Sequence, residues 1–206
     1  MSNFIIGTLD DSEGRFSSQG DGSTATPYTL EVAVGGNSVD ETTGSMVITT
    51  QEHHEIHEEN HYFLENYQDV GSGVSLYMTI VTPDTTKWAH MVALFSSEAE
   101  AYYEVYEGAA AGTGGSVLTA RNNNRNSENT SGLVITLGVT PGATGTLLFA
   151  HKLGSGTNPS QSSPGESSRG SEIILAQDTI YLVKMTSGAA DNAISYRLSW
   201  YEHTNK

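Results

Sequence analysis

The sequence predicts an all-β protein, an antiparallel β-sandwich of jelly-roll-like type with an extended N-terminal arm. The first observation is a period of two between large apolar and polar side chains, clearest in 74–80, where Ser75 and Thr79 face away from the apolar positions. The second is the abundance of turn-forming residues, including 22 glycines. The third is that no stretch has convincing amphipathic helical spacing; 96–103 comes nearest, at about one or two turns.

Ten apolar or β-branched runs are predicted as strands, separated by turn signals such as Thr140-Pro141-Gly142. In order they are 28–34, 45–50, 74–82, 87–95, 101–106, 133–139, 146–151, 171–175, 180–186 and 194–201. Two interruptions, 108–132 and 154–170, are longer than usual for connections in a compact domain. Loops of this length usually serve binding or assembly, so we expect such a role for both.

The length of 206 residues suits one domain with an appendage. We expect residues 1–45 to form an extended arm and a first strand that make assembly contacts, and residues 46–206 to form the sandwich. Between Leu9 and Pro27 the chain is polar, with Phe16 as its single aromatic residue, and cannot bury enough apolar surface to order itself. A neighbour or the rest of the subunit should hold it, with Phe4, Ile5 and Phe16 as interface candidates.

The formal net charge is −15, from 24 acidic and 9 basic residues. A surface of this sign repels phosphate backbones and anionic lipid headgroups, so we expect neither nucleic acid nor membrane as a partner. The chain has no cysteine, which excludes disulfides, thiolate metal sites and a cysteine nucleophile. No run is long enough for a membrane span, and the first residues lack the features of a signal peptide, so synthesis in the cytoplasm is expected.

The most conspicuous segment, 52–61, holds four of the seven histidines. It contains H-E-x-x-H at His57, Glu58 and His61, a spacing that on a helix would place two imidazoles for zinc in a metal-dependent hydrolase. The polar Glu59 and Asn60 in its middle, and the lack of a suitably spaced third ligand, argue against that function. We expect no catalytic residue, cofactor or bound metal, with His57 and His61 as remote metal candidates.

An extended conformation of this segment would place His53, His57 and His61 on one side of a strand, alternating with carboxylates. We predict such a polar ladder on a solvated or interface-facing edge strand, and we include His53 and His57 among the interface candidates. A structural metal ion and a pH-sensitive contact remain as alternatives.

Two further features are interface candidates. Arg121 and Arg125 lie among asparagines, where they could clamp carboxylates or carbonyls of a neighbouring copy, or where the loop could close on itself through Asx turns. The two tryptophans and ten tyrosines suit a sandwich core or subunit contacts, with Trp88 as the interface candidate, and carbohydrate stacking is the alternative.

Several short motifs follow one another between Gln51 and Lys206. They are His53-His54-Glu55-Ile56-His57 with His61-Tyr62-Phe63, then Thr82-Pro83-Asp84-Thr85-Thr86-Lys87-Trp88-Ala89-His90, Tyr106-Glu107-Gly108, Asn124-Arg125-Asn126-Ser127, the region 170–175, and Trp200-Tyr201-Glu202-His203-Thr204. In this order and spacing they resemble a group of small virion structural proteins encoded by tailed bacteriophages. The resemblance implies a place in the particle and no catalytic residues.

Three functions follow as alternatives. The first is a capsid decoration or cement protein on the outer surface of the head, a homotrimer in contact with the major capsid protein or another virion protein. The second is a host-recognition module of a tail fibre or baseplate, although no fibrous repeat is present. The third is the metal-dependent hydrolase considered above.

Overall fold

The structure is a computed structural model that describes residues 50–154 and 172–204, together with the backbone of two short strands, 16–19 and 29–32. The chain divides into two compact units, Met1–Thr50 and Gln51–Lys206. In the first, β1 (Phe16–Gln19) pairs antiparallel with β2 (Thr29–Val32), which lies in the predicted strand 28–34. The other residues of 1–49 lie outside the described part, so the arm and its assembly role stay predictions.

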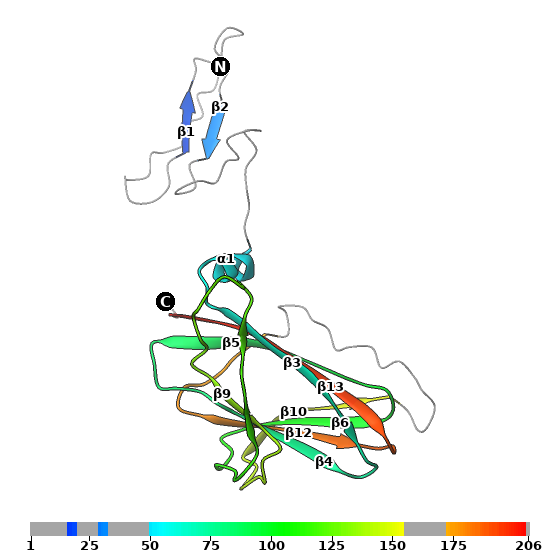
Figure 1. The fold of residues 1–206 in the computed structure, drawn as a ribbon. Coiled ribbons are helices and arrows are strands. Elements are labelled where there is room, and N and C mark those ends of the chain that lie inside the picture. Colours follow the sequence, from blue (N-terminus) through cyan, green and yellow to red (C-terminus); the bar gives the residue numbers. More distant parts are fainter. Residues whose placement is uncertain (1–15, 20–28, 33–49, 155–171, 205–206) are drawn as a thin grey trace. The chain divides into compact units, whose positions relative to one another are not determined.

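The second unit consists of two antiparallel sheets packed face to face, which confirms the predicted all-β sandwich (Figure 1). One sheet has the strand order β10-β6-β12-β4-β9-β7. Its strands are β4 (Ser75–Val81), β6 (Ala101–Glu107), β7 (Ser116–Leu118), β9 (Val134–Leu137), β10 (Thr146–Leu153) and β12 (Ile180–Ser187).

The other sheet has the order β11-β5-β13-β3-β8. Its strands are β3 (His61–Val70), β5 (Lys87–Ser97), β8 (Arg121–Asn122), β11 (Ile173–Ile174) and β13 (Asn192–Thr204). The central strand β13 pairs with β3 on one side and with β5 on the other, so Tyr201 lies opposite both His61 and His90. This double pairing brings side chains from distant parts of the sequence onto one face.

The strand β3 was not among the predicted runs. Its inward side chains Tyr62 and Leu64 are buried, but most residues in the second half of the strand are polar and exposed. The period of two is lost there, and only the long ladder with β13 reveals the strand. The short strands β7 and β8 likewise lie within the predicted loop 108–132.

The helix α1 (Gln51–His57) corrects the prediction of an extended histidine ladder in this segment. The helix buries the carboxylate of Glu55, which accepts a hydrogen bond of 2.6 Å from the side-chain amide of Gln51 one turn earlier. It ends in a turn in which Asn60 N–H donates to the Glu55 carbonyl and Glu59 has a φ of 62°. Helical spacing therefore puts His53 and His57 on one helix face, while His61 begins β3.

The core lies between the inner faces of the two sheets. Its largest fully buried side chains are aromatic and come from both sheets: Trp200 and Tyr196 on β13, Tyr103 on β6 and Tyr181 on β12. These four aromatic side chains lie in the core, as the sequence predicts. Trp88 on β5 is 37% exposed and is therefore not a core residue. No helix in the described part of the chain is long and apolar enough to cross a membrane.

Candidate functional site

The predicted interface residues do not form one site in the described part of the chain. Phe4 and Ile5 lie outside the described residues, and only the backbone of Phe16 is described. The others are distributed over three elements and one turn: His53 and His57 on α1, Trp88 on β5, Arg121 on β8 and Arg125 in the turn after it. Their role as contacts stays a prediction.

The H-E-x-x-H spacing does not lie on one helix. His57 is the last residue of α1, and a turn at Glu58 and Glu59 separates it from His61 in β3. In the described ranges, no three His, Asp or Glu side chains converge in a way that could hold a metal ion. The arrangement therefore lacks the two stacked helical turns that this hydrolase motif requires.

A cluster of aromatic and titratable side chains covers one end of the outer face of the five-stranded sheet. We call it the histidine cluster: His61 from β3, His90 from β5, Tyr201 and His203 from β13, Glu52 from α1 and Glu172 just before β11. The rings of His90 and Tyr201 stack with centroids 4.6 Å apart, and His61 stacks on the same tyrosine at 6.4 Å. Helix α1 contacts both β3 and β13 at this end (Figure 1).

Hydrogen bonds connect the histidine cluster. The Nδ1 atom of His90 lies 2.8 Å from Glu172 Oε1, which also accepts a hydrogen bond of 3.1 Å from the Tyr201 hydroxyl. The Nε2 atoms of His90 and His203 are 3.0 Å apart, so one of these nitrogens carries a proton and the other accepts it. If Nδ1–H of His90 donates to Glu172, then Nε2 of His90 is the acceptor and His203 the donor.

Sequence reasoning singled out His61 but missed His90 and His203 as its neighbours. The sequence does indicate which face of the sheet the two histidines occupy. His90 lies between the inward residues Ala89 and Met91 and therefore faces outward, and His203 lies on the same face as Tyr201, two residues before it. Which strands pair, and in what register, is needed to bring them together. The cluster contains no serine, threonine or cysteine nucleophile, and hydrogen bonds join four of its members, His90, Glu172, Tyr201 and His203.

The asparagine-rich loop closes on itself, as one of the two interpretations of the sequence had it. The backbone N–H groups of Asn124 and Asn126 donate to the side-chain oxygens of Asn122 and Asn124 respectively. The guanidinium of Arg125 donates to the Asn122 carbonyl at 3.2 Å. These contacts, all within residues 122–126, stabilise the loop's own conformation.

A buried carboxylate anchors the next part of the same loop. Glu202 on β13 accepts hydrogen bonds from the indole N–H of Trp200 at 3.0 Å, from the hydroxyl of Ser131 at 2.6 Å and from the backbone N–H of Gly132. Because each of these donors is directed at one carboxylate, the contact joins the loop to the central strand. Sequence reasoning missed this role of Glu202.

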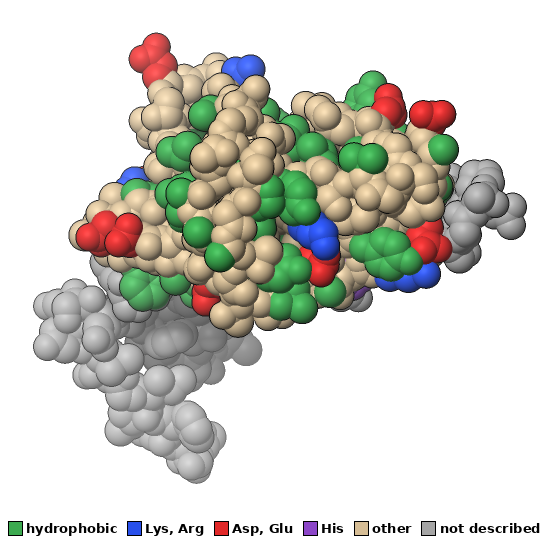
Figure 2. Space-filling model, turned by 90° about the horizontal axis from the view of Figure 1, so that it is seen from below, with side chains coloured by type: hydrophobic (Ala, Val, Ile, Leu, Met, Phe, Trp, Pro, Cys, Tyr) green, Lys and Arg blue, Asp and Glu red, His purple; other side chains and the backbone are tan. Residues whose placement is uncertain are grey.

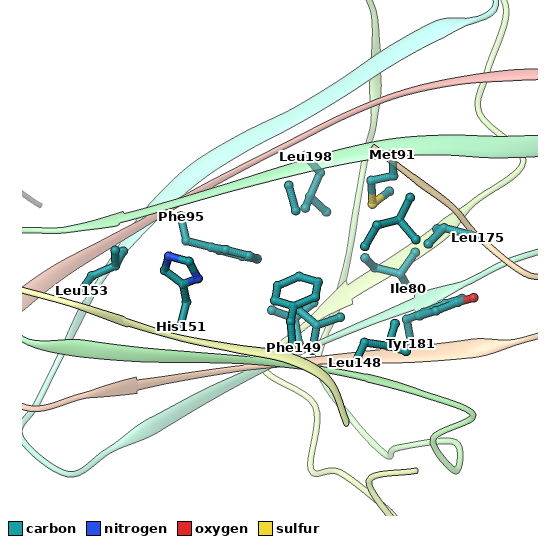
Figure 3. Close-up of a pocket in the computed structure, with 14 residues that line it drawn as sticks. Ile80, Met91, Phe95, Leu148, Phe149, His151, Leu153, Leu175, Tyr181 and Leu198 are labelled. Atoms are coloured by element: carbon teal, nitrogen blue, oxygen red, sulfur yellow. The ribbon is translucent and has the colours of Figure 1, made fainter. Parts of the chain in front are cut away.

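An apolar cavity of about 480 Å³ lies between the two sheets. Figure 3 shows side chains from both sheets pointing into it, among them Phe95 and Leu198 from one side and Phe149 and Tyr181 from the other. His151 on β10 is its one imidazole. Residues of β10 and β11 contribute to the lining, so the cavity is at the side of the sandwich that these two edge strands bound.

Several exposed apolar side chains lie on edge strands, whereas others, among them Tyr67 on β3 and Tyr102 on β6, lie on strands inside the sheets. On β10, Leu147 is 49% and Leu148 39% exposed, and Ile174 on β11 is 45% exposed. Toward the opposite edge of the six-stranded sheet, Val117 on the edge strand β7 and Val134 on the neighbouring β9 are also exposed. Figure 2 shows hydrophobic side chains scattered over a face that is otherwise mostly uncharged, with few acidic and basic groups.

The fold and these surfaces define the protein as an antiparallel β-sandwich with apolar edge strands. No protein-family model, curated protein or solved structure matches the chain.

Proposed function

We propose that this protein is a structural component of a bacteriophage particle, a decoration or cement protein that binds the outer surface of the head and acts by adhesion. It has no catalytic role in this proposal. The structural observation that supports action by adhesion is the edge strand β10, which exposes apolar side chains. The step from an adhesive sandwich to a virion rests on the sequence motifs that resemble phage virion proteins.

The strand β10 has eight residues and pairs only with β6 in the part of the chain that the structure describes. An edge strand that presents apolar side chains and a free row of backbone groups is a template for pairing with another chain. The connection that follows, 155–171, contains no aliphatic or aromatic residue besides two prolines. It therefore has no large apolar side chain with which to cover Leu147 and Leu148, and a second chain is the better partner.

The partners in this proposal are other copies of the chain, as a homotrimer, and the major capsid protein or another virion protein. Subunits would be made in the cytoplasm of the bacterial host and would then bind the assembled head. Many weak contacts on one lattice give high avidity, which suits a small subunit with an arm. The net charge of −15 suits an outer surface that makes no contact with DNA.

Deleting residues 1–27 is expected to leave the sandwich folded and to abolish binding to particles. The second compact unit, Gln51–Lys206, contains both sheets, so the deletion removes no sandwich strand. Co-sedimentation of the truncated and complete chains with heads that lack this protein measures the effect. A truncated protein with unchanged circular dichroism that still co-sediments would refute the role of the arm.

Replacing Leu147 by lysine is expected to weaken self-association by roughly tenfold or more, because a charge would enter the apolar contact at β10. Val74→Lys is the matched control, since Val74 is as exposed but lies outside the edge strands. Sedimentation velocity over a range of concentrations measures both variants. Equal association of the two variants would show that β10 is not the contact.

The number of copies per particle separates the decoration role from its alternative. Copies in register with the major capsid protein would support decoration. A few copies, located at the tail, would replace it with the tail-fibre or baseplate host-recognition module. Quantitative gel densitometry of purified particles, together with imaging of the particle, makes the measurement.

A further inference from the structure

We propose that His53 and His57 form a two-imidazole site on α1 for a divalent transition-metal ion of the copper(II) or nickel(II) type. The site differs from the H-E-x-x-H spacing, which would use His57 with His61. It is independent of the proposed role in a particle.

The geometry of the pair is that of a chelate. His53 and His57 are four residues apart on the helix, and their rings stack with centroids 4.7 Å apart and an interplanar angle of 21°. This arrangement brings the two Nε2 atoms to 2.8 Å from each other. Both side chains are exposed, so an ion that binds there can retain water on its remaining positions.

The ligand type, two imidazole nitrogens, indicates the class of ion. Nitrogen ligands lie about 2.0 Å from such metals, so two ligands at a right angle are about 2.8 Å apart, whereas a tetrahedral angle separates them by about 3.3 Å. The 2.8 Å between the two nitrogens is a hydrogen-bond distance, and it leaves them close enough to occupy adjacent positions of a square-planar or octahedral ion. Copper(II) and nickel(II) favour tetragonal geometry, and copper(II) binds nitrogen sites most tightly of the common divalent ions.

Without a metal ion the same contact is a hydrogen bond between two rings, in which one Nε2 carries the proton. Metal binding at both Nε2 atoms requires the donating ring to move its proton to Nδ1. This change of tautomer releases no proton from two neutral imidazoles. The side chains therefore need little rearrangement to exchange the hydrogen bond for the ion.

The surroundings attract a cation. Glu58 is exposed next to His57, and the chain carries a net charge of −15, which raises the local concentration of cations. No third His, Asp or Glu converges on an ion in the described residues, so these supply two ligands, and water can occupy other positions on the ion. Because the ion would bind the helix and not the unfolded chain, it would also stabilise α1.

A second pair of imidazoles provides an internal comparison. The Nε2 atoms of His90 and His203 are 3.0 Å apart, but His90 is buried and its other nitrogen contacts Glu172. An ion there would have to enter a closed network, whereas the helix pair faces solvent. The two pairs can be distinguished by separate substitutions.

The test is a titration of the complete, untagged chain with copper(II), followed by calorimetry and electron paramagnetic resonance. One copper ion per chain with two imidazole nitrogens is expected. His53→Gln and His57→Gln should each weaken binding by roughly tenfold or more. The matched control is His54→Gln, which removes an exposed imidazole of the same helix that is not part of the pair.

The proposal would be overturned by no copper binding, by loss of binding in His54→Gln equal to that in His57→Gln, by loss in His203→Gln, or by tighter binding of zinc than of copper. Circular dichroism of each variant in the absence of metal shows whether it folds. If His57→Gln alters the spectrum, His53→Gln at the other end of the pair decides the result. Retained one-to-one binding in both folded variants would likewise contradict the site.

Discussion

Replacing Glu202 by alanine is expected to destabilise the sandwich by about 3–5 kcal/mol. The carboxylate is buried and accepts hydrogen bonds from Trp200, Ser131 and Gly132, and its removal leaves these donors without their acceptor. The Trp200 indole is fully buried, so water cannot replace the lost bond without opening the core. Urea unfolding followed by tryptophan fluorescence measures the free energy of unfolding.

Two variants serve as controls for this effect. Glu202→Gln keeps one acceptor oxygen and should lose clearly less stability than the alanine variant. Glu65→Ala removes an exposed glutamate whose ion pair with Arg197 spans 3.4 Å, and such surface pairs contribute about 1 kcal/mol or less. If Glu202→Ala were no more destabilising than Glu65→Ala, the loop would not depend on this carboxylate.

At high pH the protein is expected to unfold as its buried tyrosines ionise. Burial raises the pKa of Tyr62 to about 12, with the charges of Glu202 and Glu59 adding to the effect, and burial together with a hydrogen bond to Glu107 raises the pKa of Tyr181 to about 12. Burial also raises the pKa values of Tyr103 and Tyr196. A tyrosine in the unfolded chain ionises near pH 10.

The sign of the pH dependence follows from these shifts. Because the pKa values are higher in the folded state, the neutral phenols contribute stability that is fully present below about pH 10 and is lost as the pH rises toward 12. Tyrosinate absorbance and circular dichroism should therefore change together for the buried tyrosines. Ionisation of all tyrosines with an unchanged circular dichroism spectrum would contradict this.

Tyr196→Phe offers a matched variant. The Tyr196 hydroxyl is buried and has no hydrogen-bond partner among the described residues, so phenylalanine removes a titrating group without breaking a bond. The variant should be at least as stable as the parent at neutral pH and should resist alkali better. Greater sensitivity of Tyr196→Phe to alkali would show that this hydroxyl is not a cause of alkaline unfolding.

The candidate site was only partly predictable. His61 was identified from the histidine-rich segment, but its neighbours come from β5, β13 and the residue before β11. A sequence pattern reports which face of a strand a residue occupies, and it does not report which strands are adjacent. The Glu202 contacts with Ser131 and Gly132 were missed for the same reason, since they join residues about seventy positions apart.

The helix shows a second kind of limit. Residues 51–57 contain one aliphatic residue, Ile56, and no apolar stripe, so nothing in their periodicity indicates a helix. The residue that the helix buries is Glu55, which Gln51 satisfies one turn earlier. A polar segment can be helical when such local bonds replace an apolar face, and this is visible only in three dimensions.

The sequence by itself determined that the protein is an antiparallel β-sandwich, because alternation within a strand is a local property that burial on one side imposes. The strand β13 carries that alternation clearly: Ile194, Tyr196, Leu198 and Trp200 are buried and the residues between them are more exposed. Only the tertiary structure decided the order of the strands, the helical conformation of residues 51–57, the apolar cavity and the exposed edge strand β10. These depend on contacts between residues far apart in the chain, for which a single sequence has no periodic signal.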